Sequence, residues 1–428
     1  MATYLGMRGT GDWATDQRPK NWREMILYLY PNGSAPLTAI LSKTGSRSVD
    51  DPEFNWWTKK LSEQGAAITA DSVFSTSDVT TATGTEVTGT SVAGDTVYAK
   101  MAAASVAEFR IGQTVVFRDS SDMTVEVTGR ITGRNVNADH SYIAVKLLEN
   151  DDNSSNGLHT ADKVVVIGSA NPEGGDTPQA VSYDPVKFTN YIQNHREPLE
   201  MTDEATIQRL RTGDPFDEEK RETLELHSIG IENSLIFGEQ SETTDGSGRL
   251  IRTSRGITKA ILAHASGNIS DYTTATSGTT WIAGGEAWLD EQLQDIFTFG
   301  EMEKVGFCGI AAARGIMRLA KSFGSIQLTP TSAAYGVKVL EWVTSFGTLN
   351  LKIHPLFNKA TSGLKNSIII VEPNKLKYVY LKGRDTKYLT NRQDPGIDGR
   401  IDEYMTKCSL EYHHPDAFGF LNGVGNDS

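Results

Sequence analysis

Residues 186–201 read Val-Lys-Phe-Thr-Asn-Tyr-Ile-Gln-Asn-His-Arg-Glu-Pro-Leu-Glu-Met, and the rest of the chain is best interpreted outward from this stretch. Its β-branched and aromatic residues predict one long strand. A second aromatic run, Glu-Phe-Asn-Trp-Trp-Thr-Lys-Lys-Leu at 53–61, lies more than a hundred residues upstream. We expect the two runs to pair as the arms of a long hairpin. That layout suits a protein that grips its neighbours better than it suits an active site.

The segment between the two arms has a different composition. Residues 75–91 are nearly all Thr, Ser, Gly, Val and Ala, and the stretch from Asn171 to Pro178 reads as a linker. Between them, short β-like pieces are separated by Gly, Asn and Asp, which predicts a small antiparallel barrel or sandwich over 78–175. The expected strands are 96–100, 114–118, 124–132, 142–148 and 163–167.

A long helix is predicted shortly after the second arm. Asp214 is a favoured N-cap, Pro215 suits the first helical position, and Gly238 is a suitable stop. The helix would have about 22 residues and a length of roughly 33 Å. A rod with one narrow apolar stripe usually supports a sheet laid across it. The expected stripe consists of Leu224, Ile231 and Leu235, with Ser228 between them.

The two ends of the chain differ in character. Residues 1–50 predict an arm with short helices over 22–30 and after Pro36, too short to be stable alone. From residue 249 onward the pattern mixes helix and strand. We expect helices after Gly284-Gly285 and over 310–323, and strands over 304–308, 335–339, 349–353, 367–371, 377–381 and 404–412.

Composition excludes several classes of protein. The chain has 428 residues, 38% of them hydrophobic, and no run approaches the roughly 20 apolar residues of a membrane span. Its N-terminus has no apolar signal core. The net charge of −13 argues against a dedicated nucleic-acid binder. With only Cys308 and Cys408, we expect two buried free thiols rather than a disulfide framework or a zinc site.

The sequence contains no recognisable catalytic motif. Phosphate-binding, dinucleotide-binding, nucleophile-elbow and metalloprotease patterns are all absent. His413 and His414 would point to opposite faces of a strand, so a metal role is disfavoured. Residues 394–402 resemble a calcium loop only faintly and read better as a glycine-rich turn. We therefore expect no catalytic, cofactor-binding or metal-ligating residues.

A set of exposed contacts is expected instead. Aromatic side chains provide large contact area at low entropic cost, and the charged triplet near the end of the second arm favours ion pairing over catalysis. The residues expected to make intersubunit contacts are Phe54, Trp56, Trp57, Phe188, Tyr191, His195, Arg196 and Glu197.

The order of these parts resembles the major capsid proteins of tailed bacteriophages, which have the HK97-like or Johnson fold. The resemblance is closest to the branch with a β-rich insert in the extended loop. It covers almost the whole chain. Four stretches carry it: Pro-Leu-Thr-Ala-Ile-Leu at 36–41, Phe-Asn-Trp-Trp-Thr at 54–58, Asn-Tyr-Ile-Gln-Asn-His-Arg-Glu-Pro-Leu at 190–199 and Leu-Glu-Tyr-His-His-Pro-Asp-Ala at 410–417.

The resemblance implies an α+β fold with the parts of a capsid subunit. These would be an N-terminal arm, an extended β-hairpin loop, an inserted small antiparallel β domain, a peripheral domain with a long spine helix, and an axial α/β domain. The implied bounds are 1–50 for the arm, 51–77 and 176–200 for the loop, 78–175 for the insert, 201–240 and 361–428 for the peripheral domain, and 241–360 for the axial domain.

The implied function is assembly of an icosahedral head. Pentamers and hexamers of one chain would enclose a double-stranded DNA genome without sequence-specific binding, after assembly in the host cytoplasm. A portal, a separate scaffolding protein and a cement protein are the expected partners, with no membrane. Three alternatives remain: an encapsulin-like nanocompartment shell, a β-rich tail or adhesin protein, and an enzyme with an unrecognised site.

Overall fold

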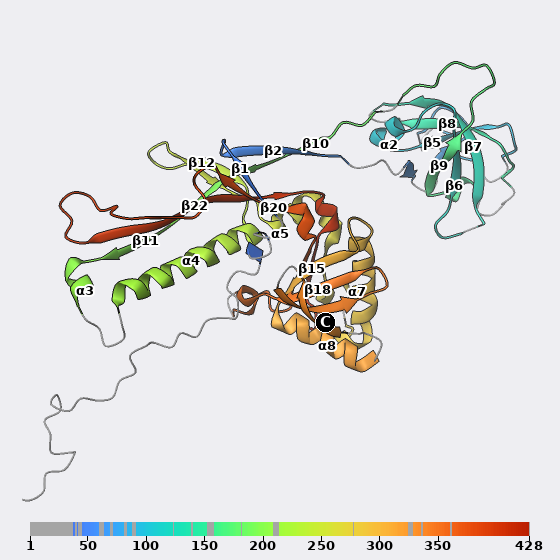
Figure 1. The fold of residues 1–428 in the computed structure, drawn as a ribbon. Coiled ribbons are helices and arrows are strands. Elements are labelled where there is room, and N and C mark those ends of the chain that lie inside the picture. Colours follow the sequence, from blue (N-terminus) through green and yellow to red (C-terminus); the bar gives the residue numbers. More distant parts are fainter. Residues whose placement is uncertain are drawn as a thin grey trace, which may run out of the picture. The chain divides into compact units, whose positions relative to one another are not determined.

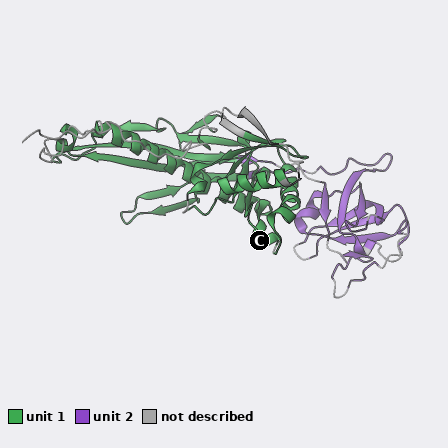
Figure 2. Ribbon diagram, turned by 90° about the horizontal axis from the view of Figure 1, so that it is seen from below, with its two compact units in different colours: residues 1–56, 187–428 green, residues 57–186 purple. Residues whose placement is uncertain are grey.

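The computed structural model divides into two compact units. It describes residues 37–38, 41, 45–59, 64–68, 72–80, 84–87, 91–122, 124–137, 140–151, 158–180, 182–208, 214–276, 278–323, 328–334, 337–359 and 362–427. Unit 1 comprises Met1–Trp56 with Lys187–Ser428, and unit 2 comprises Trp57–Val186 (Figure 2). The helix expected over 22–30 lies outside the described residues.

Unit 2 is a seven-stranded antiparallel sheet around its own core. Each of the five strands predicted in this region has a counterpart within a few residues. Alternate residues such as Val115, Phe117 and Ile131 are buried together in the core. In sheet order the strands are β3 (Gly65–Ala67), β9 (Lys163–Ser169), β6 (Gln113–Arg118), β7 (Glu126–Asn135), β8 (Tyr142–Leu147), β5 (Thr96–Lys100) and β4 (Val73–Phe74), accompanied by α2 (Ala103–Glu108) and η1 (Leu158–Thr160).

Unit 1 contains a sheet that lies along the long helix α4 (Pro215–Phe237), as Figure 1 shows. The central strand is β22 (Arg400–Tyr412), which pairs antiparallel with the strands on both sides. The other members are β1 (Ser46–Val49), β20 (Leu376–Leu381), β11 (Gln193–Met201) and β21 (Lys387–Leu389), with the short helix α3 (Asp203–Ile207) after β11.

The long strand predicted over 186–201 is two strands. β10 (Val186–Tyr191) pairs with β2 (Glu53–Thr58), whereas β11 pairs with β22 across the sheet under α4. The break falls at Ile192, which is buried in the core of unit 1. The prediction that the whole stretch pairs with the upstream run is therefore wrong for its second half.

The ends of α4 were predicted correctly, and so were Ile231 and Leu235 of its buried stripe, whereas Leu224 was not. Asp214 accepts a hydrogen bond from the Phe216 amide at 2.9 Å, Pro215 opens the helix and Gly238 caps its end. Leu224 is exposed, because the sheet faces the neighbouring residue of the same turn. The side chains that α4 buries are Thr223, His227, Ile231, Glu232, Leu235 and Ile236.

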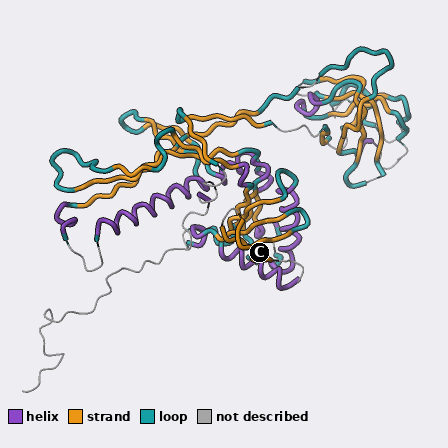
Figure 3. Tube along the Cα trace, viewed as in Figure 1, coloured by secondary structure: helices purple, strands orange, loops and turns teal. Residues whose placement is uncertain are grey.

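The rest of unit 1 is a mixed sheet with helices against it, shown by type in Figure 3. In sheet order its strands are β14 (Ile269–Asp271), β23 (Gly419–Asn422), β19 (Ile368–Val371), β15 (Glu303–Cys308), β18 (Thr348–Ile353), β17 (Val337–Val343) and β16 (Leu328–Ala334). The helices are α5 (Ile257–His264), α6 (Tyr272–Ala275), α7 (Trp281–Phe297) and α8 (Ile310–Phe323), and a separate hairpin is formed by β12 (Ser241–Thr244) and β13 (Leu250–Thr253). The 3-10 helices η2 (Ser266–Asn268), η3 (Pro355–Asn358), η4 (Pro373–Lys375) and η5 (Pro415–Ala417) lie in the connections.

This mixed sheet separates two hydrophobic cores. β19 reads Ile-Ile-Ile-Val with every residue buried, as expected of a strand covered on both faces. Its Ile368 and Ile370 join the core formed with α7 and α8, while Ile369 and Val371 join the core shared with α4 and α5. Two strands from beyond residue 360, β19 and β23, thus complete the sheet expected for the axial region.

Helix α7 begins earlier than predicted. It starts at Trp281 and runs through Gly284-Gly285, where we expected a break before the helix. A Cβ added at Gly285 would lie 2.7 Å from the ring of Trp281, so the glycine makes room for this buried indole. The close packing keeps the glycine inside the helix despite its poor propensity.

The predicted α+β class and the two buried thiols are confirmed. Cys308 and Cys408 are free and buried, and burial raises the pKa of each thiol to about 12. Such thiols are protonated and inert at neutral pH. Among the helices that the structure describes, none combines the length and hydrophobicity of a membrane-spanning segment.

Candidate assembly interface

The two-stranded ribbon of β2 and β10 has one buried face and one exposed face. β2 alternates strictly, with Phe54, Trp56 and Thr58 buried and the residues between them exposed. The two strands are also joined by a hydrogen bond that the Thr189 hydroxyl donates to Asn55 Oδ1 at 2.6 Å. Period-two alternation of this kind gives a strand two chemically different surfaces.

The buried face of the ribbon is an aromatic cluster centred on Trp56. Its ring stacks on Phe54 with centroids 5.6 Å apart and on Phe188 at 6.0 Å. The edge of Tyr412, at the end of β22, meets Trp56 at 5.1 Å, and His264 of α5 lies 4.8 Å from Phe188. Edge and offset contacts of this type add to the gain from burying area. The cluster fixes the ribbon to the body of its own unit.

The exposed face of the ribbon carries one large apolar side chain of β2, Trp57, which is 62% exposed. The other exposed residues of this face are Glu53 and Asn55 of β2 and Lys59 just after it. Val186 at the start of β10 is 61% exposed, but it shares a face with Phe188 and Asn190. An exposed tryptophan within a polar rim is typical of a protein contact surface.

Asn190, near the end of β10, joins the ribbon to the rest of unit 1 by hydrogen bonds. It was not among the residues predicted from the sequence. The side chain is fully buried on β10. Its Nδ2 donates to the Leu410 carbonyl at 2.9 Å and to the Arg255 carbonyl at 3.2 Å. Its Oδ1 accepts from the Arg255 amide at 2.8 Å and from the Tyr191 amide at 2.9 Å. One amide side chain thus joins β10 to β22 and to the start of α5.

The charged triplet on β11 makes contacts within its own chain. Arg196 forms a two-pronged ion pair with Glu403 of β22, one prong joining Nη2 to Oε2 at 2.6 Å and the other joining Nε to Oε1. The Arg196 hydrogen bonds hold the pKa of Glu403 below its ordinary value, against an opposing effect of burial. The sequence favoured an ion pair over catalysis and left open whether it lies within or between subunits; the structure contains such a pair within the chain.

Two histidines meet between β11 and α4. The rings of His195 and His227 lie 6.5 Å apart between centroids. His227 Nε2 is 2.7 Å from the Thr406 hydroxyl, and His195 Nε2 is 3.3 Å from the Ser234 hydroxyl. Burial, and then the charge of His227, lower the pKa of His195 to about 4. Burial also lowers the pKa of His227, while Glu197 opposes the shift.

Glu232 anchors the N-terminal segment to α4. The carboxylate is fully buried and accepts hydrogen bonds from the Leu37 amide at 2.7 Å, the Thr38 amide at 2.9 Å and the Thr38 hydroxyl. His354 Nε2 lies 3.0 Å from Glu232 Oε1, and His354 Nδ1 accepts from the Leu356 amide. That acceptor role places the ring proton on Nε2, so His354 donates to Glu232. The glutamate thus binds two backbone amides that lie 195 and 194 residues earlier in the chain.

Residues 394–402 resemble a calcium loop faintly, but the carboxylate of Asp402 is bound by groups of the same chain. Asp402 accepts from Arg400 Nη2 at 2.8 Å, from the Asn391 amide at 3.0 Å and from the Tyr388 hydroxyl. Burial would raise the pKa of Asp402, but these hydrogen bonds outweigh it and lower the pKa. Within the described residues no group of three or more His, Cys, Asp or Glu comes together as a metal site.

The eight residues expected at intersubunit contacts thus fall into three groups. Phe54 and Trp56 are buried in the chain's own core, and Phe188 packs against it. Tyr191, His195 and Glu197 are half-buried, while Trp57 and Arg196 are exposed. Their roles between subunits stay a prediction.

The polar clusters described above join the β2–β10 ribbon, helix α4 and the N-terminal segment to the rest of unit 1. This arrangement is that of a structural protein. A family profile described as SU10 major capsid protein matches residues 7–425. A relative, the major capsid protein of Pseudomonas phage PaMx41, is 25% identical over 439 residues, covering 99% of this chain and 97% of the relative.

Similar folds occur among solved structures at low sequence identity. That of Mycobacterium phage Bobi has a TM-score of 0.43 at 6% identity, covering 95% of this chain and 96% of the other. The SrpI encapsulin of Synechococcus elongatus has a TM-score of 0.39 at 14% identity, covering 56% of this chain and 76% of the other.

The chain belongs to the SU10 major capsid protein family. The predicted HK97-like fold and capsid function are confirmed, and the nanocompartment interpretation becomes a minor alternative. The protein is a component of a phage virion.

Proposed function

We propose that copies of this chain form pentamers and hexamers that close into an icosahedral head around double-stranded DNA. The observation that carries the proposal is the two-faced ribbon of β2 and β10. Its inner face is fixed to its own subunit by Trp56, while its outer face presents Trp57. Burial of such a surface stabilises a contact by about 25 cal/mol per Å².

The proposed roles of the parts follow the expected plan. Residues 1–50 serve as the arm, 51–77 and 176–200 as the extended loop, and 78–175 as the insert. The peripheral domain takes 201–240 and 361–428, and the axial domain takes 241–360 with β19 and β23 counted in its sheet. The contact residues proposed between subunits are the exposed Trp57 and Arg196 with the half-buried Tyr191, His195 and Glu197. Phe54, Trp56 and Phe188 are proposed to support this surface from within the subunit.

The proposed partners are a portal, a separate scaffolding protein and a cement protein, with assembly in the host cytoplasm. The acidic balance of the chain, −13 overall, supports a shell that encloses DNA without binding it by sequence. We propose that the protein has no catalytic activity. In support, the buried carboxylates Glu232, Asp402 and Glu403 are each engaged by donors of the same chain.

The test is the substitution Trp57→Ala, compared with Glu53→Ala on the same face of β2. Both proteins are expressed with the neighbouring phage genes and viewed by negative-stain electron microscopy. We expect Trp57→Ala to give folded subunits with few or no closed shells, and Glu53→Ala to assemble like the wild type. Normal shell yield from Trp57→Ala would refute the role of the outer face. Fibres or persistent monomers from the wild type would refute the shell itself.

A further inference from the structure

Helices α7 and α8 cover one face of the mixed sheet and carry opposite charges on their exposed sides. Their buried sides share one hydrophobic core with that sheet (Figure 1). The Trp281 indole of α7 also donates a hydrogen bond to the Gly315 carbonyl of α8 at 3.0 Å. The two helices are therefore fixed side by side in one subunit, and their exposed sides are left for a contact outside it.

The exposed side of α8 is basic. One stripe is formed by exposed residues at three- or four-residue spacing: Ile310, Arg314, Met317 and Lys321. Arg318 lies next to the stripe and is half-buried. The three cations have no ion-pair partner among the described residues. Arginine and methionine together with an exposed isoleucine are typical of a protein contact surface.

The exposed side of α7 is acidic. It carries two pairs of carboxylates at four-residue spacing, Glu286 with Asp290 and Glu291 with Asp295. Glu286 is half-buried, and the other three are exposed. In the part of the chain that the structure describes, none of the four forms an ion pair. Like charges at this spacing repel one another along a helix, so a row of cations beside them would be stabilising.

A pocket beside the acidic side of α7 has room for a basic side chain. Its volume is about 190 Å³. Its lining combines the carboxylates of Glu286 and Asp290 with three buried apolar side chains, those of Leu289, Leu319 and Trp342. A cavity of about 150 Å³ accommodates a benzene ring, so a planar guanidinium group fits this space. The stem of an arginine would pack on the apolar lining while its charged end meets the carboxylates.

We propose that the basic side of α8 in one copy of the chain docks on the acidic side of α7 in a second copy, with Arg314 entering this pocket. The inference rests on the proposed function, because it names a contact within the pentamers and hexamers. At 1.5 Å per residue, the basic stretch 314–321 spans roughly 11 Å and the acidic stretch 286–295 roughly 14 Å, so one can lie along the other.

The opposite charges also determine the kind of contact. Two copies that met through the same side would bring like charges together. Two copies that meet through unlike sides are joined head to tail, and a head-to-tail contact closes into a ring when its rotation allows. The charges of α7 and α8 therefore suit a ring of copies and oppose a two-fold dimer through either helix.

The enclosed DNA fits the basic side of α8 less well. The stripe has only three cations near it and includes the apolar side chains of Ile310 and Met317. The four carboxylates of the adjacent helix would repel a phosphate backbone. A second copy, which brings its own acidic side, meets no such repulsion.

Charge reversal with rescue tests the contact in the full-length protein, expressed with the neighbouring phage genes and viewed by negative-stain electron microscopy. Arg314→Glu with Arg318→Glu reverses the charge of α8, and Glu286→Lys with Asp290→Lys reverses that of α7. Either pair should lower the yield of closed shells at least about tenfold, because like charges then face each other. All four substitutions together bring opposite charges back and should restore closed shells.

Lys146→Glu is the control, because Lys146 is an exposed cation of unit 2 that belongs to neither helix. It should assemble like the wild type, and circular dichroism should show that every variant is folded. If the wild type forms shells and both reversals assemble equally well, this contact is refuted while the proposed function stands. A folded fourfold variant without shells would also count against the pairing. Normal shells with less packaged DNA after reversal of α8 would assign its basic side to DNA and overturn the contact. A wild type without shells would instead refute the proposed function.

Discussion

The two halves of helix α4 are held in opposite ways. The C-terminal half buries Ile231, Leu235 and Ile236 in the main core of unit 1. The N-terminal half buries only Thr223 before His227, and leaves Leu224 and Leu226 exposed. One helix therefore serves as a core element at one end and as a surface at the other. The difference teaches that capping can fix where a helix begins without fixing which side of it is buried.

Replacing Glu232, in the C-terminal half of α4, should lower the free energy of unfolding more than any other substitution proposed for this helix. Glu232→Ala leaves the Leu37 and Thr38 amides and His354 without their shared acceptor in a buried site. We expect a loss of about 3–5 kcal/mol in the free energy of unfolding, measured by guanidinium denaturation. Glu222→Ala removes an exposed glutamate of the same helix and should change stability by less than about 0.5 kcal/mol. Equal effects of the two substitutions would show that the anchor contributes nothing.

Truncating the core side of the helix should have the next largest effect. Leu235 is fully buried, so Leu235→Ala removes buried methyl groups and leaves a cavity. The expected loss is about 2–5 kcal/mol in the same denaturation experiment. A loss below about 1 kcal/mol would mean that the core around Leu235 refills easily.

The histidine pair at the middle of the helix should make stability depend on pH. The folded pKa of His195 lies at about 4, below its ordinary value of 6.5, and the pKa of His227 is lowered as well. As pH falls through 6.5, the unfolded chain binds protons that the folded chain cannot, so stability is lost progressively down to about pH 4. The loss is largest for His195, whose pKa differs most between the folded and unfolded chains.

Guanidinium midpoints at pH 7 and pH 5 measure this slope while most carboxylates stay ionised. His195→Gln and His227→Gln should each reduce the difference between the two midpoints. His264, whose pKa is also lowered by burial and by Arg255, leaves a residual slope in both variants. The control His140→Gln alters an exposed ring of unit 2 and should leave the slope unchanged. An unaltered slope in the two test variants would exclude the pair as its source.

Sequence reasoning succeeded where the signal was local. Asp214, Pro215 and Gly238 marked the ends of α4, because caps act within one turn. It failed where the signal was distant. The sequence around Glu232 does not indicate that its carboxylate binds the Leu37 amide. The sequence around Asn190 does not indicate that its side chain binds Leu410 and Arg255, where β10 ends and β11 begins a separate pairing.

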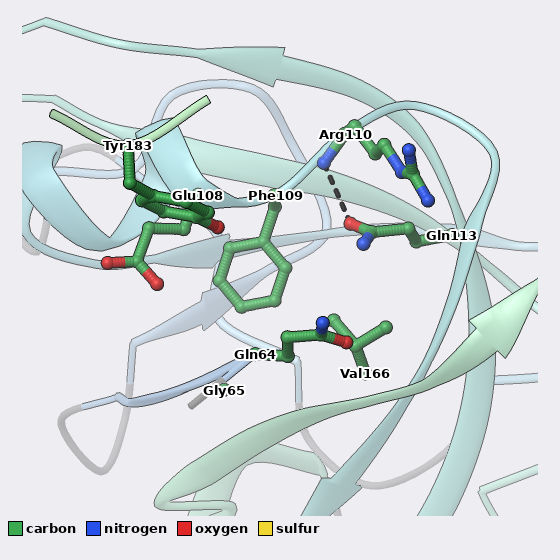
Figure 4. Close-up of a pocket in the computed structure, with 8 residues that line it drawn as sticks. All are labelled: Gln64, Gly65, Glu108, Phe109, Arg110, Gln113, Val166 and Tyr183. Carbon is green, nitrogen blue, oxygen red and sulfur yellow. Dashed lines mark hydrogen bonds between the residues drawn. The ribbon is translucent and has the colours of Figure 1, made fainter. Parts of the chain in front are cut away.

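The contact residues show the same limit. The aromatic run at 53–61 predicted a strand, and Trp57 is exposed as a contact residue should be. The sequence could not say that Trp56 faces Tyr412, which is more than 350 residues away in the chain. A pocket in unit 2, lined in part by Gln64, Gln113 and Tyr183, was not anticipated either, since these residues come from separate segments with no shared motif (Figure 4).

The smallest expected effect concerns the exposed half of α4. Leu226 is 56% exposed, so Leu226→Ala should change the free energy of unfolding by less than about 0.5 kcal/mol, in contrast to Leu235→Ala on the same helix. Because the chemical change is identical, the difference between the two variants measures how unequally the halves are packed. A loss above about 1 kcal/mol would show that the N-terminal half is packed like the C-terminal half. An unchanged stability with fewer closed shells under the electron microscope would instead assign this half of the helix to a contact between subunits.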